Sequence, residues 1–308
     1  MSIELKAKYI GAMVGSALGD AIGELAFQCP EQEPLKVLIS RTAELVYTDD
    51  TAMAIGLAES ILEKCGIHQQ HLGGIFSRNF FREPWRGYAS GPPAIFSRVR
   101  SHGLSYVETA KALFGGLGSF GNGAAMRIGP VGLFFHRAKN LYDEACASAE
   151  VTHAHPVGKD GAAVLAVAIA QALKLDPKEK FSSSEFLTSL VNIARTPEIR
   201  KKIGFLQDLL TEQAPSHVAA DRLGRSVAVD ESMPFALYSF LRFPESFEAC
   251  LFCAVLNGGD RDTLGAMAGS LSGAYLGIDA IPNVWRRKLE NREMIERLAS
   301  SLWEMTPR

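Results

Sequence analysis

The stretch Ile10-Gly-Ala-Met-Val-Gly-Ser-Ala-Leu-Gly-Asp-Ala-Ile22 decides the fold, because its glycines recur at every fourth residue. Four residues span little more than one helical turn, so these glycines share one face of a helix. A second stretch repeats the spacing at Gly265, Gly269 and Gly273. Glycine inside a helix costs about 0.5–1 kcal/mol relative to alanine. The repeated glycine face therefore predicts helices whose backbones approach closely at the centre of the fold.

The apolar residues recur with a helical period along most of the chain. Residues 10–18 repeat at three and four, and residues 161–173 form a broad apolar face. The best strand candidate is residues 35–39, which is too isolated to build a sheet. Residues 174–230 are more polar and read as a peripheral helical section, and no long linker rich in Pro, Gly and Ser divides the chain. We predict an all-α protein that forms one domain over residues 1–308.

Composition excludes several classes of function. The 308 residues carry a formal net charge of −2, and the longest basic runs are only residues 200–202 and 286–288. A protein that binds a nucleic-acid backbone needs a basic face, so we expect no nucleic-acid partner. The longest apolar stretch, residues 161–173, is shorter than the ~20 residues that span a bilayer, so we expect no membrane partner.

The cysteines point to a reducing compartment. Their number, five, is odd, and they are scattered along the chain, which is not the pattern of a disulfide framework. Cys250 and Cys253 form a CxxC pair, but the apolar residues around them favour a buried helix over a zinc or redox site. We expect a cytoplasmic protein, and a monomer.

Two short segments each place aspartate and threonine at the start of an apolar helix: Tyr47-Thr-Asp-Asp-Thr51 and Asn257-Gly-Gly-Asp-Arg-Asp-Thr263. Taken singly, either segment is equally well explained as a capped helix. Together they supply four carboxylates and several hydroxyls, which are the hard oxygen ligands that Mg²⁺, Mn²⁺ or Ca²⁺ prefers. Burying such a cluster costs free energy unless cations neutralise it. The pair of segments therefore predicts a divalent-metal site.

A third segment, Gly118-Ser-Phe-Gly-Asn-Gly123, is rich in glycine and is followed by residues 124–127, where we expect a helix to begin. Such a loop exposes backbone N–H groups that can hold a phosphate or diphosphate. An ordinary turn is the alternative, since the spacing matches neither the Rossmann nor the P-loop motif. His153 is a further candidate to contact a phosphate or hydroxyl, or a satisfied structural histidine.

Taken in order, these segments resemble the ADP-ribosylglycohydrolases, a family that includes the nitrogenase-reductase-activating glycohydrolases and the vertebrate ADP-ribosyl-acceptor hydrolases. The matching motifs span nearly the whole chain, and the sequence around them is most similar to that of the serine-directed branch. They are Gly19-Asp20, Tyr47-Thr-Asp-Asp-Thr51, Arg86-Gly-Tyr88, Gly118-Ser-Phe-Gly-Asn-Gly123 with Met126-Arg127, Thr152-His153 and Gly258-Gly-Asp-Arg-Asp-Thr263.

The resemblance implies a compact orthogonal multi-helix bundle with a binuclear Mg²⁺ centre, in which Mn²⁺ could substitute. By position, the implied metal ligands are Thr48, Asp49, Asp50, Asp260, Asp262 and Thr263. The implied diphosphate loop comprises Gly118, Ser119, Gly121, Asn122 and Gly123, with His153 beside it. Phe114 and Phe120 match the aromatic residues that sandwich adenine, although aromatics at this spacing are more often core.

Two positions depart from the family pattern. A gating glutamate that contacts metal usually follows the Asp of the first Gly-Asp by seven residues, and this chain has Phe27 there. Glu24 and Glu31 lie about one turn to either side, and Glu24 is the expected substitute. Arg261, between two of the aspartates, could face outward or contact the leaving group.

The implied activity is hydrolysis of the bond between ADP-ribose and an acceptor, expected to be a serine side chain of a protein. Asp49 or Asp50 would orient water or accept its proton, and Glu24 would protonate the leaving group. The expected partners are ADP-ribose and ADP-ribosylated proteins. An arginine-linked substrate is one alternative, and a non-catalytic relative that binds ADP-ribose is another.

Overall fold

A computed structural model describes residues 4–307 of the chain, and within that range the regular structure is entirely helical. The first eight α-helices are α1 (Leu5–Gln28), α2 (Gln32–Arg41), α3 (Asp49–Lys64), α4 (Gln69–Arg82), α5 (Gly91–His102), α6 (Tyr106–Lys111), α7 (Gly129–Phe134) and α8 (Leu141–Glu150). They are followed by α9 (Pro156–Lys174), α10 (Ser183–Ile193), α11 (Pro197–Thr211), α12 (Ser216–Leu223), α13 (Val229–Arg242), α14 (Phe247–Leu256), α15 (Arg261–Leu276), α16 (Asn283–Lys288) and α17 (Arg292–Met305). Short 3₁₀ turns are η1 (Phe114–Gly116), η2 (Asn122–Ala124) and η3 (Ile278–Ala280). The prediction of an all-α fold is confirmed.

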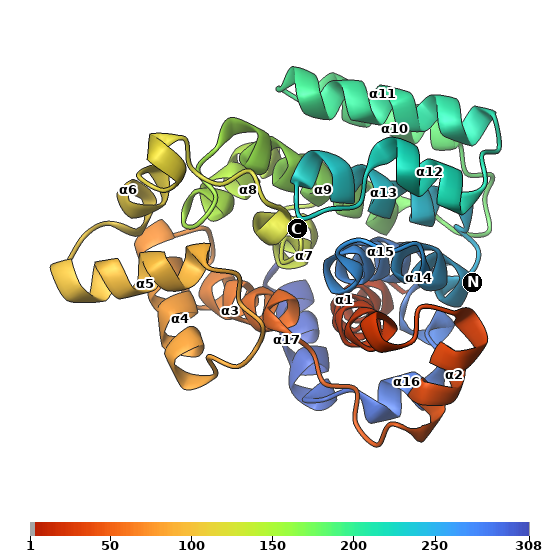
Figure 1. The fold of residues 1–308 in the computed structure, drawn as a ribbon, viewed down its shortest axis with the longest axis horizontal. Helices are drawn as coiled ribbons and strands as arrows, with labels where there is room; N and C mark the ends of the chain where they lie inside the picture. Colours follow the sequence, from red (N-terminus) through yellow and green to blue (C-terminus); the bar gives the residue numbers. More distant parts are fainter. Residues whose placement is uncertain (1–3, 308) are drawn as a thin grey trace.

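The two glycine-rich segments pair as antiparallel helices at the centre of the molecule, α1 against α15 (Figure 1). The backbones touch along the glycine faces. A Cβ atom placed on Gly19 would lie 1.9 Å from the carbonyl oxygen of Gly265, and one on Gly265 would lie 2.1 Å from that of Gly19. The same approach recurs between Gly15 and Gly269. No side chain larger than hydrogen fits there, so the predicted close helix contact is confirmed.

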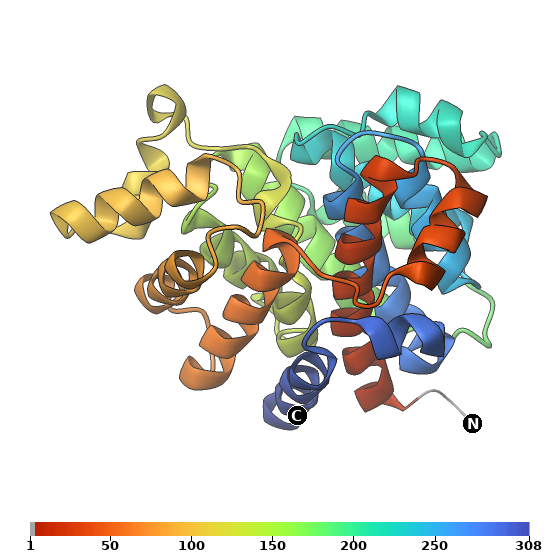
Figure 2. The same cartoon turned by 60° about the horizontal axis from the view of Figure 1, so that its bottom comes forward.

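Several of the remaining helices run across this central pair. Figure 1 looks nearly along α1, while α5 and α11 lie across the view, and Figure 2 shows α1 upright in the middle of the molecule. Helices α9 and α13 pack against α15 and extend the apolar core. The predicted polar section of the chain forms α10, α11 and α12 at the outer edge (Figure 1). The crossings make the fold an orthogonal helical bundle.

Helices α1 and α9 are long and apolar enough to cross a membrane by length and composition alone. In this fold 78% of the apolar 18-residue segment of α1, and 83% of the corresponding segment of α9, is buried inside the protein. Both helices therefore serve as core helices here.

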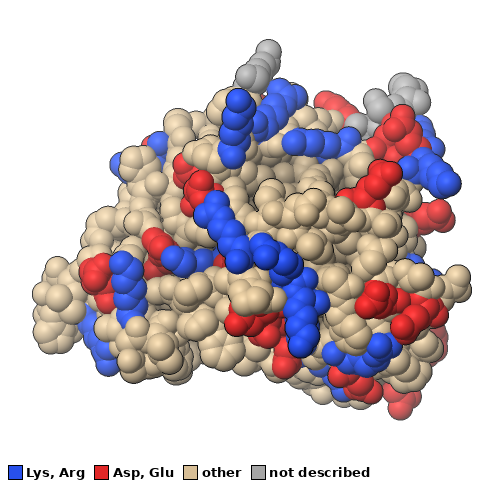
Figure 3. Space-filling view, turned by 90° about the horizontal axis from the view of Figure 1, so that it is seen from above, with Lys and Arg blue, Asp and Glu red and all other residues tan. Residues whose placement is uncertain are grey.

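On the face drawn in Figure 3, Lys and Arg side chains lie among Asp and Glu side chains.

The structure defines two local details that the sequence left open. Residues 35–39, the best strand candidate, belong to α2, because Leu35 and Ile39 are one helical turn apart and both enter the core. Pro34 lies in the first turn of that helix, where the missing N–H group costs nothing. After the glycine-rich loop the chain forms the 3₁₀ turn η2, and the next α-helix begins only at Gly129.

Candidate metal and substrate site

The glycine contact between α1 and α15 brings together the two ends that carry aspartate. A Cβ atom on Gly23 would lie 2.5 Å from the Cα atom of Asp262, so the end of α1 touches the beginning of α15. Helix α3, which begins at Asp49, joins them. Residues more than 200 positions apart in the chain thus meet at one point. They do so because the glycines at the contact let the backbones of α1 and α15 approach closely.

Asp20 organises this meeting point, and sequence reasoning missed its role. Its fully buried carboxylate accepts hydrogen bonds from the backbone N–H of Thr48 (3.0 Å) and of Thr51 (3.0 Å). It also accepts from the hydroxyls of Thr48 (2.8 Å) and Thr51 (2.6 Å). The carboxylate of α1 thereby fixes the N-terminus of α3, where the partial positive charge of a helix end favours an anion. The only indication of this role in the sequence was that Gly19-Asp20 is one of the motifs that match the family.

The N-cap residues of these two helices do not cap them with their side chains. Thr48 is the N-cap residue of α3 and Asp260 that of α15, and neither side chain accepts a hydrogen bond from its own helix. Thr48 instead donates its hydroxyl to Asp20. The alternative of ordinary capped helices therefore does not describe these two N-cap side chains.

Four carboxylates and a hydroxyl line one cavity of about 270 Å³: Asp49, Asp50, Asp260, Asp262 and Thr263. Burial and the charge of Asp20 raise the pKa of Asp49 to about 7, and burial and the charge of Asp260 raise that of Asp262 to about 8. Burial, Asp20 and Asp262 raise the pKa of Asp50 well above its usual range. Burial raises that of Asp20 itself to about 6. The protein thus concentrates carboxylates that repel one another.

The donor set fits divalent cations. Asp50 Oδ1 is buried and has no hydrogen-bond partner among the described residues, and an orphaned buried oxygen is costly unless a ligand satisfies it. The oxygen atoms of these carboxylates and threonines match the preference of Mg²⁺ and Mn²⁺. Within residues 4–307 no three His, Cys, Asp or Glu side chains already stand close enough to hold a metal ion.

The glycine-rich loop borders the same cavity. Its shape depends on close backbone approaches: Gly118 has a φ of +73°, and a Cβ atom there would lie 2.8 Å from the backbone nitrogen of His155. Ser119 accepts a hydrogen bond from the N–H of Gly121 (3.1 Å). Bonds between the loop and residues 227–229 hold it in place, among them Asn122 N–H to the carbonyl of Val227 (2.8 Å). The loop is a fixed element of the site rather than a free turn.

Asn122 links the loop to the carboxylates. Its side-chain amide donates to Asp260 (2.7 Å) and to Ser232 (3.2 Å). The nitrogen of this amide is thus committed to orienting Asp260. Asp260 is placed further by the turn before it, where Gly259 has a φ of +75° and a Cβ atom would lie 2.0 Å from the carbonyl oxygen of Arg225.

His153 lines the cavity beside the glycine-rich loop and is held in one orientation. The fully buried Arg127 guanidinium, which can only donate, gives a hydrogen bond to the Thr152 hydroxyl oxygen (2.8 Å). The same hydroxyl is hydrogen-bonded to Nδ1 of His153 (2.8 Å), which fixes the orientation of the ring. Burial, and then Arg127, lower the pKa of His153 to about 3, so the ring is neutral. Nε2 of this neutral ring therefore lies beside Gly121 and Gly123.

A second cavity, of about 370 Å³ and lined mainly by apolar groups, adjoins the first at Ser119 and Gly121. Phe114 and Phe120 both line it, with 62% and 49% of their surfaces exposed, so neither is a core residue. The ring of His155 lies 5.4 Å from that of Phe120. Sequence reasoning missed His155, whose Nδ1 accepts from the N–H of Val157 and fixes the ring. The cavity has the flat aromatic walls that suit a nucleobase.

Comparison with known proteins identifies the family of the chain. The sequence profile of the family described as ADP-ribosylglycohydrolase matches residues 1–308. The chain belongs to the ADP-ribosylglycohydrolase family. It is 31% identical to human ADP-ribosylhydrolase ARH3, covering 96% of this chain and 92% of that protein. It is also 31% identical to an uncharacterised protein of Archaeoglobus fulgidus, covering 98% and 97%. A solved structure titled "ADP-ribosylglycohydrolase-related protein complex" superposes with a TM-score of 0.75 at 26% identity, covering 99% of both chains.

The structure shows where the departures from the pattern of this family lie. Phe27 is in the last turn of α1 with 50% of its surface exposed. Glu24, one turn earlier, is exposed and lines a groove together with Thr48 and Asp262. Glu31 precedes α2 as its N-cap residue and lines none of these cavities. Arg261 donates to the backbone carbonyl of Val255 near the end of α14, so its guanidinium is directed away from the carboxylates.

Proposed function

We propose that this protein hydrolyses the bond between ADP-ribose and a protein side chain, with serine as the acceptor and Mg²⁺ as the cofactor. The observation that carries the proposal is the order of the cavities. The aromatic cavity opens at Ser119 and Gly121 into the cavity of the glycine-rich loop and the carboxylates. An adenine, a diphosphate and a distal ribose follow one another in the same order along ADP-ribose.

Each part of this molecule finds a matching group. Phe120 and His155 provide faces on which adenine can stack, and such stacking contributes about 1–3 kcal/mol per base. Backbone N–H groups of the loop supply donors for the diphosphate, and Nε2 of His153 lies beside them. The hydroxyls of the distal ribose would then reach Asp49, Asp50 and Asp262.

Hydrolysis breaks the bond from C1 of the distal ribose to the serine oxygen and joins a water oxygen to C1, releasing ADP-ribose and the free hydroxyl. Asp49 or Asp50 would orient the water and take its proton, a role that suits a carboxylate whose pKa is raised toward neutrality. Glu24 would supply the proton to the serine oxygen. Two bound Mg²⁺ ions, held by Thr48, Asp49, Asp50, Asp260, Asp262 and Thr263, would polarise the water and the ribose hydroxyls.

The decisive measurement is release of ADP-ribose from serine-linked and arginine-linked ADP-ribosyl peptides, with Mg²⁺ and with EDTA. We expect Mg²⁺-dependent release from the serine-linked peptide. Asp50→Asn should lower the rate by about 10²-fold or more, because it removes a carboxylate that touches both metal and water. Asp279→Asn is the matched control, since Asp279 is exposed in η3 and lines none of the cavities. Release that is unaffected by EDTA, or no Mg²⁺ binding in calorimetry, would contradict the proposal.

Two other functions use the same site. Preferred release from the arginine-linked peptide would identify an arginine ADP-ribosylhydrolase. Phe27, an apolar residue where the family usually carries a gating glutamate, favours a protein that binds ADP-ribose without cleaving it. Tight ADP-ribose binding without release from either peptide would establish that second function.

A further inference from the structure

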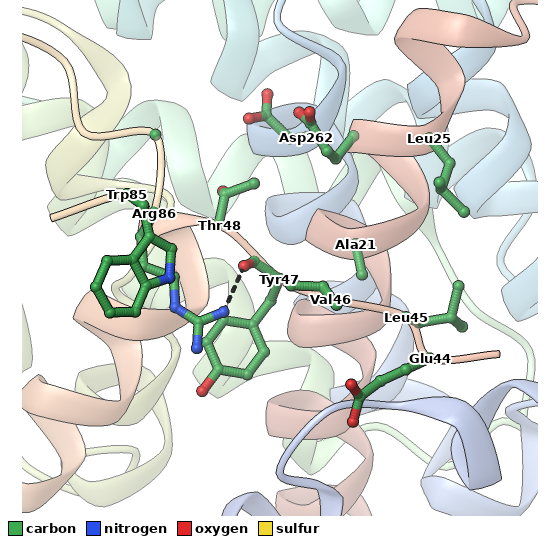
Figure 4. Close-up of a pocket in the computed structure, with 12 residues that line it drawn as sticks. Ala21, Leu25, Glu44, Leu45, Val46, Tyr47, Thr48, Trp85, Arg86 and Asp262 are labelled. Carbon is green, nitrogen blue, oxygen red and sulfur yellow. Dashed lines mark hydrogen bonds between the residues drawn. The ribbon is translucent and has the colours of Figure 1, made fainter. Parts of the chain in front are cut away.

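A third cavity adjoins the carboxylate cavity on the side away from the cavity lined by Phe114 and Phe120. It is a groove of about 430 Å³ between α1, residues 44–48 and residues 85–87, and it shares Gly87 and Asp262 with the carboxylate cavity. Figure 4 shows Asp262 and Thr48 at one end of this groove and Glu44 at the other. The ribose carbon that bears the acceptor would sit by the carboxylates. The groove therefore begins where ADP-ribose ends.

The walls of the groove are held in place without any ligand. Arg86 forms a two-pronged ion pair with Glu290 (2.7 and 2.8 Å) and a further pair with Glu83 (3.2 Å). Its guanidinium also donates to the carbonyl of Tyr47 (3.0 Å) and stacks on the Tyr47 ring at 4.3 Å (Figure 4). One buried side chain thus ties residues 85–87 to residues 46–48, and the groove is formed in advance.

The surface of the groove combines an aromatic wall with acidic residues. Trp85 is 71% exposed and Val46 50% exposed, so apolar area is available to a partner. Glu24 and Glu44 are exposed and have no ion pair within residues 4–307. The single cation in the described lining is Arg86, whose guanidinium is already occupied by Glu83 and Glu290. The free charge of the groove is therefore negative.

We infer that this groove binds the polypeptide that carries the ADP-ribose and selects acceptor sites flanked by lysine or arginine. The inference rests on the proposed function, since it places the acceptor at the end of a bound ADP-ribose. The aliphatic stem of a flanking basic residue packs against Trp85, and its charged head lies near Glu44. Recognition by charge complementarity accounts for both the exposed tryptophan and the unpaired Glu44.

The test compares kcat/KM on three serine-linked substrates: ADP-ribosyl-serine alone, a peptide with lysine at the three positions on each side of the serine, and the same peptide with glutamate there. For the wild-type protein we expect a preference of at least about tenfold for the lysine peptide, which shrinks as salt is added. Glu44→Lys should remove or invert the preference. The matched control is Glu31→Lys, an equal charge change outside the groove, which should keep it.

A second variant tests the aromatic wall. Trp85→Ala should raise KM for both peptides several-fold and leave KM for ADP-ribosyl-serine alone unaltered, because the free amino acid does not reach along the groove. Equal rates on the two peptides in the wild type, or an unchanged preference in Glu44→Lys, would overturn the groove assignment while leaving the hydrolase intact. If no ADP-ribosyl substrate in serine or arginine linkage is cleaved, the proposed function fails, and the groove assignment fails with it.

Discussion

At the scale of single residues, the environment of each carboxylate separates their roles. Asp20 is surrounded by four donors from Thr48 and Thr51, so it shapes the site, whereas Asp50 keeps an oxygen with no partner and is free to bind. Glu24 differs from both: it is exposed, and it lines the groove between α1, residues 44–48 and residues 85–87, together with Thr48 and Asp262. That position suits a group that delivers a proton to the departing side chain.

Glu24→Gln tests this role at a single atom. We expect fold and ADP-ribose binding to persist and turnover of a serine-linked substrate to fall by about 10²-fold, as loss of a general acid commonly does. Glu31→Gln provides the control, because Glu31 lies outside the cavities and its side chain caps nothing. Single-turnover rates and ADP-ribose titrations of the three proteins measure the effect. A Glu24→Gln enzyme as fast as the wild type would assign the proton to another group.

At the scale of elements, the contact between α1 and α15 is the least replaceable feature of the fold. Gly19→Ala would place a methyl carbon 1.9 Å from a backbone carbonyl, and neither helix can move without displacing Asp20 and Asp262. We expect a loss of about 3 kcal/mol or more in the free energy of unfolding, the range of severe overpacking. Gly74→Ala in α4, where no atom lies within 4 Å of the new Cβ, should instead stabilise the protein by about 0.5–1 kcal/mol. Urea denaturation of both variants checks the opposite signs, and equal effects would refute the packing argument.

The same elements show which features the sequence could predict. The glycine spacing predicted the central helix contact because only close packing explains such costly residues inside helices. The aspartate segments predicted a shared site because buried carboxylates need a common cation. The helical state of residues 35–39 could not be predicted, since a short apolar run fits a strand or a helix equally. Nor could the role of Asp20 or the acidic groove, because their partners come from distant segments that no spacing relates.

At the scale of the whole molecule, clustering the carboxylates makes the stability of the protein depend on pH and metal together. In the unfolded chain these aspartates are ionised above about pH 4. In the folded protein Asp49 keeps its proton until about pH 7 and Asp262 until about pH 8. The folded state therefore binds more protons in this window, and linkage requires its stability to fall as the pH rises. His153, with a folded pKa of about 3, acts in the opposite direction, but only below about pH 6.5.

Without metal, the free energy of unfolding should thus decrease from pH 6.5 to pH 8 and level off above it. Saturating Mg²⁺ should abolish most of this decrease, because the cation takes over the neutralisation that protons provide and binds only the folded carboxylate cluster. Stabilisation by Mg²⁺ is consequently expected to be larger at pH 8 than at pH 6.5, where protons compete for the same oxygens. Urea titrations at both pH values, in EDTA and in Mg²⁺, measure the four free energies. A metal-free protein that becomes more stable toward pH 8 would show that the carboxylates are already neutralised by the protein itself, and the metal centre would then have no electrostatic reason to exist.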